Sequence, residues 1–281
     1  MVTHRFRNNF CISTRSETHL THTIRRYSGF VAESVKRELY LKFLGSALGP
    51  AWLFITPLAT LALFIGVFGY ALRGNVPGAS NPDDYWIFLC AGLLPWQLFS
   101  DVVLRGQSLY VDNMAVLKKI AIPKLILPMI LVINALIQFA IIAAIFLGAL
   151  LVVGRWPGWA VVSAIPFVLG YVLFAAGAAM TLAPANVFFR DVAPATTLGL
   201  LFCFWATPIV YSLKQGSNAV SDALLQFNPF AWASTQMQAI FVHGEWASSG
   251  TAAGFLSVSV LVFAFGLLVF TRSAALIADE L

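Results

Sequence analysis

Residues 113–128 read NMAVLKKIAIPKLILP, a short basic segment between two long apolar runs. The segment carries Lys118, Lys119 and Lys124, whereas the runs on either side carry almost no charge. Because charged side chains are costly in hydrocarbon, this loop must lie at a membrane surface. An excess of lysine and arginine in a short loop indicates the cytoplasmic side. We therefore expect the loop to fix the topology and to offer a contact to a cytoplasmic partner.

The composition is that of an integral membrane protein. The chain is 59% hydrophobic and 10% charged, and its mean hydropathy is +0.83. These values leave no room for a separate soluble domain of ordinary size. We attribute the net charge of +5 to orientation and contact with anionic lipid, not to nucleic-acid binding. The three cysteines are far apart, so neither structural disulfides nor a metal site are expected.

The apolar runs predict an all-α fold with six membrane spans. Their approximate bounds are 50–72, 85–104, 125–153, 159–182, 194–213 and 251–270. In the second span Asp101 and Arg105 are four residues apart and can pair. In the third span Asn134 and Gln138 share a face and are expected to look into a helix bundle. The small-residue patch AAGAA at 175–179 predicts a close helix contact in the fourth.

Charge supports a topology with both termini in the cytoplasm. Of the 17 lysines and arginines, all except Arg73, Arg155 and Lys214 fall in segments that six spans place inside. The first 49 residues lack a signal-peptide core, so we expect the amino terminus to be retained in the cytoplasm.

The amino-terminal part divides into two segments ahead of the 45–281 transmembrane domain. Residues 1–23 are polar and predict a mobile cytoplasmic tail. In 24–44 apolar residues recur every four positions, from Tyr27 to Phe43, with basic residues on other faces. This pattern predicts an amphipathic helix in the cytoplasmic interface. A soluble helix packed on a partner protein is the alternative.

Residues 222–242 do not fit a simple hairpin between the last two spans. The stretches 222–226 and 229–242 predict two short helices broken at Asn228 and Pro229, because asparagine caps helices and proline suits their first position. Fourteen apolar-rich residues are about six too few to span a bilayer. We expect a re-entrant or outer-surface helical pair.

The sequence contains no recognisable nucleotide-binding or catalytic motif. No glycine is followed by lysine, so a phosphate-binding loop of the G-x-x-x-x-G-K-[ST] type is excluded. The spans carry no catalytic constellation, and Asp101 is their only carboxylate. We therefore predict a non-enzyme, without cofactor of its own, whose energy comes from another chain.

Aromatic side chains are the other signal in the spans. Flat rings along a channel can contact the apolar faces of sugars and still let a chain slide. The alternative is an aromatic belt at the membrane surfaces, to which Trp52, Tyr85 and Tyr211 are especially open. The candidate channel rings are Trp52, Phe64, Phe68, Tyr85, Phe88, Trp96, Phe99, Trp205 and Tyr211.

Four stretches in order resemble the membrane subunits of ABC-2 type bacterial exporters, in the branch that exports O-antigen polysaccharide, capsule and teichoic acid. They are RELYLKFLGSALGPAWLFITPL at 37–58, CAGLLPWQLFSD at 90–101, DNMAVLKKIAIPKLILP at 112–128 and QFNPFAWASTQMQAIF at 226–241. The resemblance covers nearly the whole chain from about residue 25. Each motif alone is weak, but the combination in this order is specific.

This resemblance implies a homodimer in the bacterial inner membrane that works with two cytoplasmic ATPase chains, which hold ATP and Mg. It places the ATPase-coupling helix in the loop 112–124 and outer gate helices at 222–242, with Asn228, Pro229, Phe230 and Trp232 at the gate. The coupling contacts would be Asn113, Leu117, Lys118, Lys119, Ile120, Pro123 and Lys124. The residues that could attract the diphosphate of an undecaprenyl-linked glycan are Arg25, Arg26, Arg37 and Lys42.

From these features we expect an export permease for lipid-linked polysaccharide, with O-antigen as the first candidate and a channel at the dimer interface. Two alternatives share part of the pattern. One is an ABC-2 exporter of a small lipid or a drug, and the other is a membrane scaffold that only anchors a cytoplasmic partner.

Overall fold

A computed structural model of the chain describes residues 29, 31–38, 40, 46–64, 66, 84–113, 125–213 and 219–280. The chain divides into two compact units after Leu44. In the first unit residues 31–38 are helical, with Val31 and Val35 buried and Glu33, Lys36 and Arg37 exposed. This alternation agrees with an amphipathic helix, and its place at a membrane surface stays a prediction.

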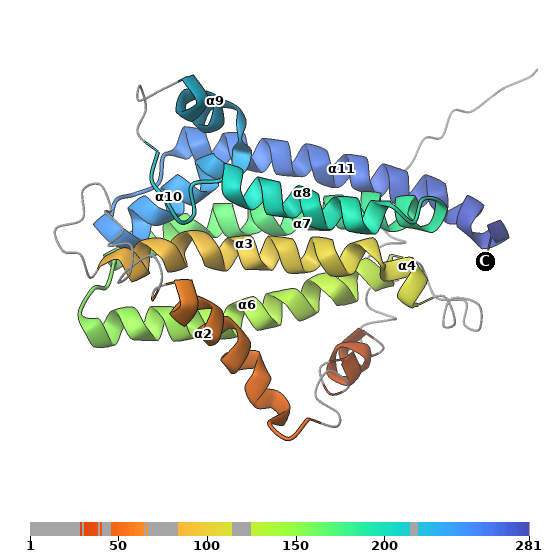
Figure 1. Ribbon diagram of the computed structural model, residues 1–281, viewed down its shortest axis with the longest axis horizontal. Coiled ribbons are helices and arrows are strands. Elements are labelled where there is room, and N and C mark those ends of the chain that lie inside the picture. Colours follow the sequence, from red (N-terminus) through yellow and green to blue (C-terminus); the bar gives the residue numbers. More distant parts are fainter. Residues whose placement is uncertain are drawn as a thin grey trace, which may run out of the picture. The chain divides into compact units, whose positions relative to one another are not determined.

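The second unit is a helix bundle built around α3 (Tyr85–Gln107). Its long neighbours are α6 (Ile126–Val153) and α7 (Ile165–Phe188), and α11 (Ser249–Glu280) packs in turn against α7, as Figure 1 shows. Four helices of the described residues are long and apolar enough to cross a membrane: Tyr85–Gln107, Ile126–Val153, Gly158–Phe188 and Ser249–Ser273. The chain is thus a multi-pass membrane protein, and six spans remain a prediction.

The shorter helices lie near the two ends of this bundle. At one end are α9 (Ala219–Phe227) and α10 (Pro229–His243), and at the other are α4 (Leu109–Asp112) and the carboxyl end of α11 (Figure 1). In the region of the first predicted span, at 50–72, the structure describes a 3₁₀ turn, η1 (Gly49–Ala51), followed by α2 (Trp52–Phe64).

Small residues determine the closest helix contact, between α7 and α11. A Cβ atom on Gly266 would lie 2.1 Å from the carbonyl oxygen of Gly177, and one on Gly177 would lie 2.5 Å from that of Val262. The two backbones therefore touch, as the patch at 175–179 predicted. Hydrocarbon gives helices no hydrophobic reason to associate, so van der Waals contact of this kind stabilises the pair.

Three helix ends differ from the expected span bounds. The span expected at 159–182 starts with a 3₁₀ helix η4 (Gly158–Ala164), and α7 then runs past the loop expected from 184, because a helix can pass Pro184 at the loss of one hydrogen bond. The span expected at 194–213 is the shorter α8 (Val192–Ala206). It ends there because Pro208 forces Thr207 into an extended conformation.

The third difference concerns the last span. It was expected to end at 270, but α11 continues beyond Arg272 to Glu280. The end of the hydrocarbon does not stop a helix, because water satisfies its exposed backbone groups beyond it.

Candidate functional site

Aromatic rings from five helices meet where α10 begins. Phe230, in the first turn of α10, lies 4.6 Å from Phe99 of α3 and 4.8 Å from Phe174 of α7, measured between ring centroids. Trp96 contacts both Phe99 and Phe230. Three further rings complete this aromatic cluster: Tyr171 of α7, Phe204 of α8 and Phe255 of α11. The cluster fixes the first turn of α10 in the interior of the bundle.

Beside the cluster, the chain from Thr207 to Val210 is buried although it is not helical. The Thr207 carbonyl accepts from the Ile209 amide, and side chains satisfy the carbonyl groups of the other three residues. Gln238 of α10 donates to the carbonyl oxygens of Pro208 at 2.9 Å and Ile209 at 3.3 Å, and the Tyr85 hydroxyl donates to that of Val210 at 2.8 Å. Irregular backbone at membrane depth is tolerated only when protein or water satisfies it in this way.

Asn228 joins the break between α9 and α10 to the end of α8. Its side-chain oxygen accepts from the Phe230 amide at 2.9 Å, which is the helix cap that the sequence predicts. Its side-chain nitrogen donates to the Ala206 carbonyl at 3.1 Å and to the Thr207 hydroxyl at 3.2 Å. One asparagine thus determines how two predicted elements meet.

The predicted gate residues are close together in this region. Pro229 starts α10, Phe230 lies in the aromatic cluster, and the Trp232 indole donates to the Leu225 carbonyl of α9 at 2.8 Å. Whether they gate a path, and whether they face the outside, stays a prediction.

The predicted channel rings divide into two groups. Tyr85, Phe88, Trp96 and Phe99 are buried among side chains of their own chain, whereas Trp52 of α2 and Trp205 of α8 are exposed. Tyr211 is half-buried, and its hydroxyl donates to the Trp205 carbonyl. The side chain of Phe64 and the whole of Phe68 lie outside the described residues. Of the candidate rings whose side chains the structure describes, Trp52 and Trp205 are therefore the two that are open to a path along the surface.

Asn113 is the one predicted coupling residue that the structure describes, and it ends the short helix α4. Its side chain donates to the Leu109 carbonyl at 2.9 Å, and Tyr110 of α4 stacks on Phe270 of α11 at 5.2 Å. Burial raises the pKa of the Tyr110 hydroxyl, so this ring stays neutral. Leu117, Lys118, Lys119, Ile120, Pro123 and Lys124 lie outside the described residues.

Of the four residues predicted to attract a diphosphate, the structure describes only Arg37, which is exposed on its helix. Arg25, Arg26 and Lys42 lie outside the described residues. The expected pair of Asp101 and Arg105 is present on α3. A second ion pair, which the sequence analysis did not predict, joins Asp84 before α3 to Arg155 after α6 at 2.8 Å.

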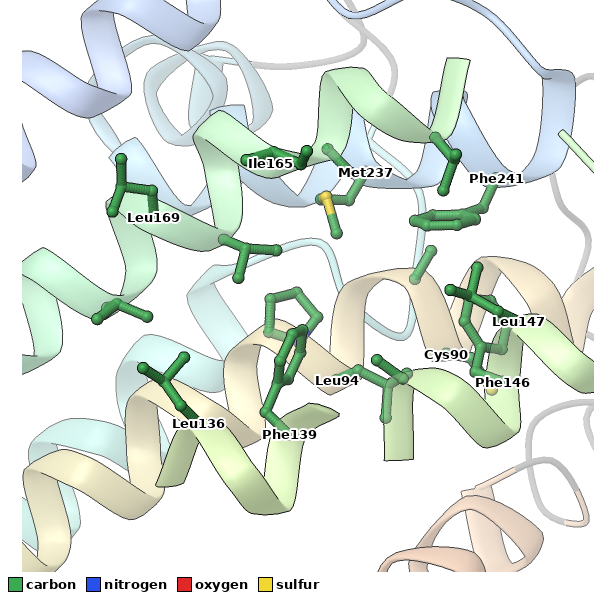
Figure 2. Close-up of a pocket in the computed structure, with 17 residues that line it drawn as sticks. Cys90, Leu94, Leu136, Phe139, Phe146, Leu147, Ile165, Leu169, Met237 and Phe241 are labelled. Carbon is green, nitrogen blue, oxygen red and sulfur yellow. The ribbon is translucent and has the colours of Figure 1, made fainter. Parts of the chain in front are cut away.

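An apolar cavity of about 410 Å³ lies between α3, α6, α7 and α10. Figure 2 shows Leu136 and Phe139 of α6 facing Ile165 and Leu169 of α7, with Met237 of α10 beside them. Every side chain that lines it is apolar. Such a cavity excludes water and can take a hydrocarbon chain or another lipophilic group.

Sequence reasoning missed Ser234 and Gln238, the α10 residues that hold the buried segment 207–210. Ser234 donates to the Pro208 carbonyl at 3.2 Å, one turn from Gln238. Both also lie against Gly92, where an added Cβ would be 3.0 Å from the serine hydroxyl and 3.1 Å from the glutamine nitrogen. The available signal was two polar residues four apart on an apolar helix, which indicates a polar partner at membrane depth.

Comparison with known proteins gives named relatives. The O-antigen export system permease protein RfbA of Myxococcus xanthus is 31% identical over 244 residues, covering 86% of this chain and 92% of the relative. A protein of the same name from Klebsiella pneumoniae is 26% identical over 209 residues, covering 74% and 78%. The polysialic acid transport protein KpsM of Escherichia coli is 33% identical over 85 residues, covering 28% and 31%. No protein-family model matches the chain.

Proposed function

The chain belongs to the ABC-2 family of polysaccharide export permeases, and we propose that it is the membrane subunit of an ATP-driven exporter of undecaprenyl-pyrophosphate-linked O-antigen. The observation that carries this proposal is the match to the O-antigen permease of Myxococcus xanthus over almost the whole length of both chains. The four helices that are long and apolar enough to cross a membrane, and the non-helical segment 207–210 held inside the bundle, are compatible with transport.

The functional unit is a homodimer whose copies meet at α8. None of the residues of α8 is buried, and Leu198, Leu201, Phe202 and Trp205 are all more than half exposed. A 15-residue helix is too short to stand alone across hydrocarbon, which needs about 20 residues. A second copy would cover this helix, and Trp205 would then lie beside the interface and its channel.

The coupling loop receives the motion of two cytoplasmic ATPase chains. Its described base, Asn113, is hydrogen-bonded to α4, and α4 is stacked on α11 through Tyr110 and Phe270. A push on Lys118 and Lys119 would therefore be passed to a long membrane helix. Both termini and the four candidate diphosphate residues are placed in or at the cytoplasm, with the chain in the bacterial inner membrane.

The second candidate is export of a small lipid or a drug. The apolar cavity of Figure 2 favours it, because a lipophilic molecule would fit a lining without polar groups. A scaffold without transport has no comparable support.

Deletion of the gene and complementation with the wild-type chain tests the proposal. The deletion strain should accumulate polysaccharide inside the cell and lose it from the surface, and complementation should restore it. Polysaccharide extracted from the surface and from the cytoplasm is measured by gel and sugar analysis. Normal surface polysaccharide in the deletion strain would contradict the proposed function, and loss of a lipid from the outer leaflet instead would favour the second candidate.

A further inference from the structure

A pocket lined by both polar and apolar side chains lies between α2, α3 and α6, three apolar helices. Its volume is about 240 Å³, and its polar lining residues are Thr56, Thr60, Gln97, Ser100, Asp101 and Gln138. Each comes from a helix that is otherwise strongly apolar. Polar side chains in the hydrocarbon region face protein or a water-filled cavity, because lipid cannot satisfy them.

The hydrogen-bonding capacity of this pocket is suited to a hydroxyl-rich ligand. The hydroxyl groups of Thr60 and Ser100 donate to carbonyl groups of their own helices, at 2.9 and 3.2 Å, so their oxygens can still accept. The amide group of Gln97 can donate and accept, and Gln138, which already has a partner, is not limited to one bond because a side-chain amide has two donors and two acceptor sites. The Asp101 carboxylate is paired with Arg105 and retains lone pairs for a hydroxyl donor.

Charge argues against a phosphate ligand here. Asp101 is the charged residue of the lining, and its carboxylate would repel an anion. The lining also includes Phe139, whose ring gives an apolar surface of the kind that stacks on a sugar face. A neutral saccharide unit meets both conditions, since it presents hydroxyl groups at its edge and C–H groups on its face.

We propose that this pocket is a saccharide subsite, in which Gln97, Asp101 and Gln138 hydrogen-bond a neutral sugar unit of the exported polymer. This inference rests on the proposed function. The subsite lies within one chain and adjoins the apolar cavity, because Leu94 and Phe139 line both.

The first test compares export by polar-to-apolar variants in the deletion strain. The double variant Gln97→Leu, Gln138→Leu keeps side-chain volume but removes both amide groups, and surface polysaccharide should fall at least tenfold at equal membrane level. Gln97→Asn, which keeps the amide, should export much better than Gln97→Leu. The control is Thr181→Val on α7, whose hydroxyl only bonds the Gly177 carbonyl of its own helix, and it should export normally.

The second test asks whether the pocket holds water. In a chain with Cys11 and Cys203 replaced by serine, Ser100→Cys should react rapidly with a charged methanethiosulfonate reagent. Native Cys90 lines the apolar cavity and should react slowly. Added polymer from the same bacterium should slow labelling of Ser100→Cys.

The outcomes separate the subsite from the proposed function. Wild-type export by the double variant, or labelling of Ser100→Cys no faster than that of Cys90, would overturn the subsite while leaving the export function intact. Normal surface polysaccharide in the strain lacking the chain would overturn the export function itself.

Discussion

At the scale of single residues, Asn228 shows how a capping residue can set tertiary structure. Its oxygen caps α10 and its nitrogen binds the end of α8, so one side chain satisfies backbone groups of two helices. The sequence predicted the cap, because asparagine followed by proline is a helix-start signal. The contact to α8 could not be predicted, because it joins residues that are 22 positions apart.

Replacement of Asn228 should separate these two roles. Asn228→Ala should lose the cap and both bonds to α8, which costs about 2 to 4 kcal/mol of stability. Asn228→Ser keeps a capping hydroxyl and should lose less. The measurement is the apparent melting temperature of the purified chain in detergent, followed by tryptophan fluorescence. Equal melting temperatures for the wild type and Asn228→Ala would contradict this account.

At the scale of elements, the contact between α7 and α11 depends on glycine. Gly266 lies so close to the Gly177 carbonyl that no side chain fits without separating the helices. This contact was predictable in part, because small residues at 175–179 indicate a close approach. Its partner on α11 was not, because a pattern on one helix does not identify the surface that meets it.

A matched pair of substitutions tests this contact. Gly266→Ala should destabilise the chain by more than about 2 kcal/mol, since the added methyl group would overlap backbone atoms. A Cβ atom added at Gly148 of α6 would have no other atom within 4 Å. Gly148→Ala should therefore leave the stability of the chain unchanged or raise it by roughly 0.5 to 1 kcal/mol, because alanine has the better helix propensity. Thermal stability in the same detergent compares them. A similar loss in both variants would indicate a general effect of alanine, not a helix contact.

The span boundaries show where hydropathy fails at this scale. A helix continues beyond the hydrocarbon when nothing stops it, as α7 and α11 do, and it stops early when proline constrains the preceding residue, as at Thr207. The candidate channel rings show a second limit. Hydropathy and aromatic content pointed to Phe88, Trp96 and Phe99, but the sequence does not tell whether these rings meet a channel or other helices, and in the structure they are buried.

At the scale of the whole molecule, α8 is the surface at which we propose that two copies meet, because none of its residues is buried. Its uncovered residues include Cys203, which is exposed. If two copies meet at α8, a short bis-maleimide should join two chains through Cys203 in native membranes when Cys11 is replaced by serine, and Cys203→Ser should abolish the product. Buried Cys90 serves as an internal control. If Cys203 gives no crosslinked dimer while a cysteine placed on α6 does, the interface between copies is not at α8.

The coupling loop belongs to the same scale, because it joins this chain to a partner. The double change Lys118→Glu, Lys119→Glu reverses two charges and should either detach the ATPase or lower export at least tenfold with altered ATP hydrolysis. Co-purification and ATPase activity are measured together with surface polysaccharide. Unchanged assembly, hydrolysis and export would mean that the loop only signals topology.

The most direct test of the account is transport in inverted membrane vesicles that contain this chain and its ATPase. Lipid-linked polysaccharide supplied on the outside should enter the vesicle lumen only when ATP is added, and become protected from an added glycosidase. Vesicles that lack the chain but contain the ATPase should protect none. Equal protection with and without this chain would contradict its assignment as the export permease.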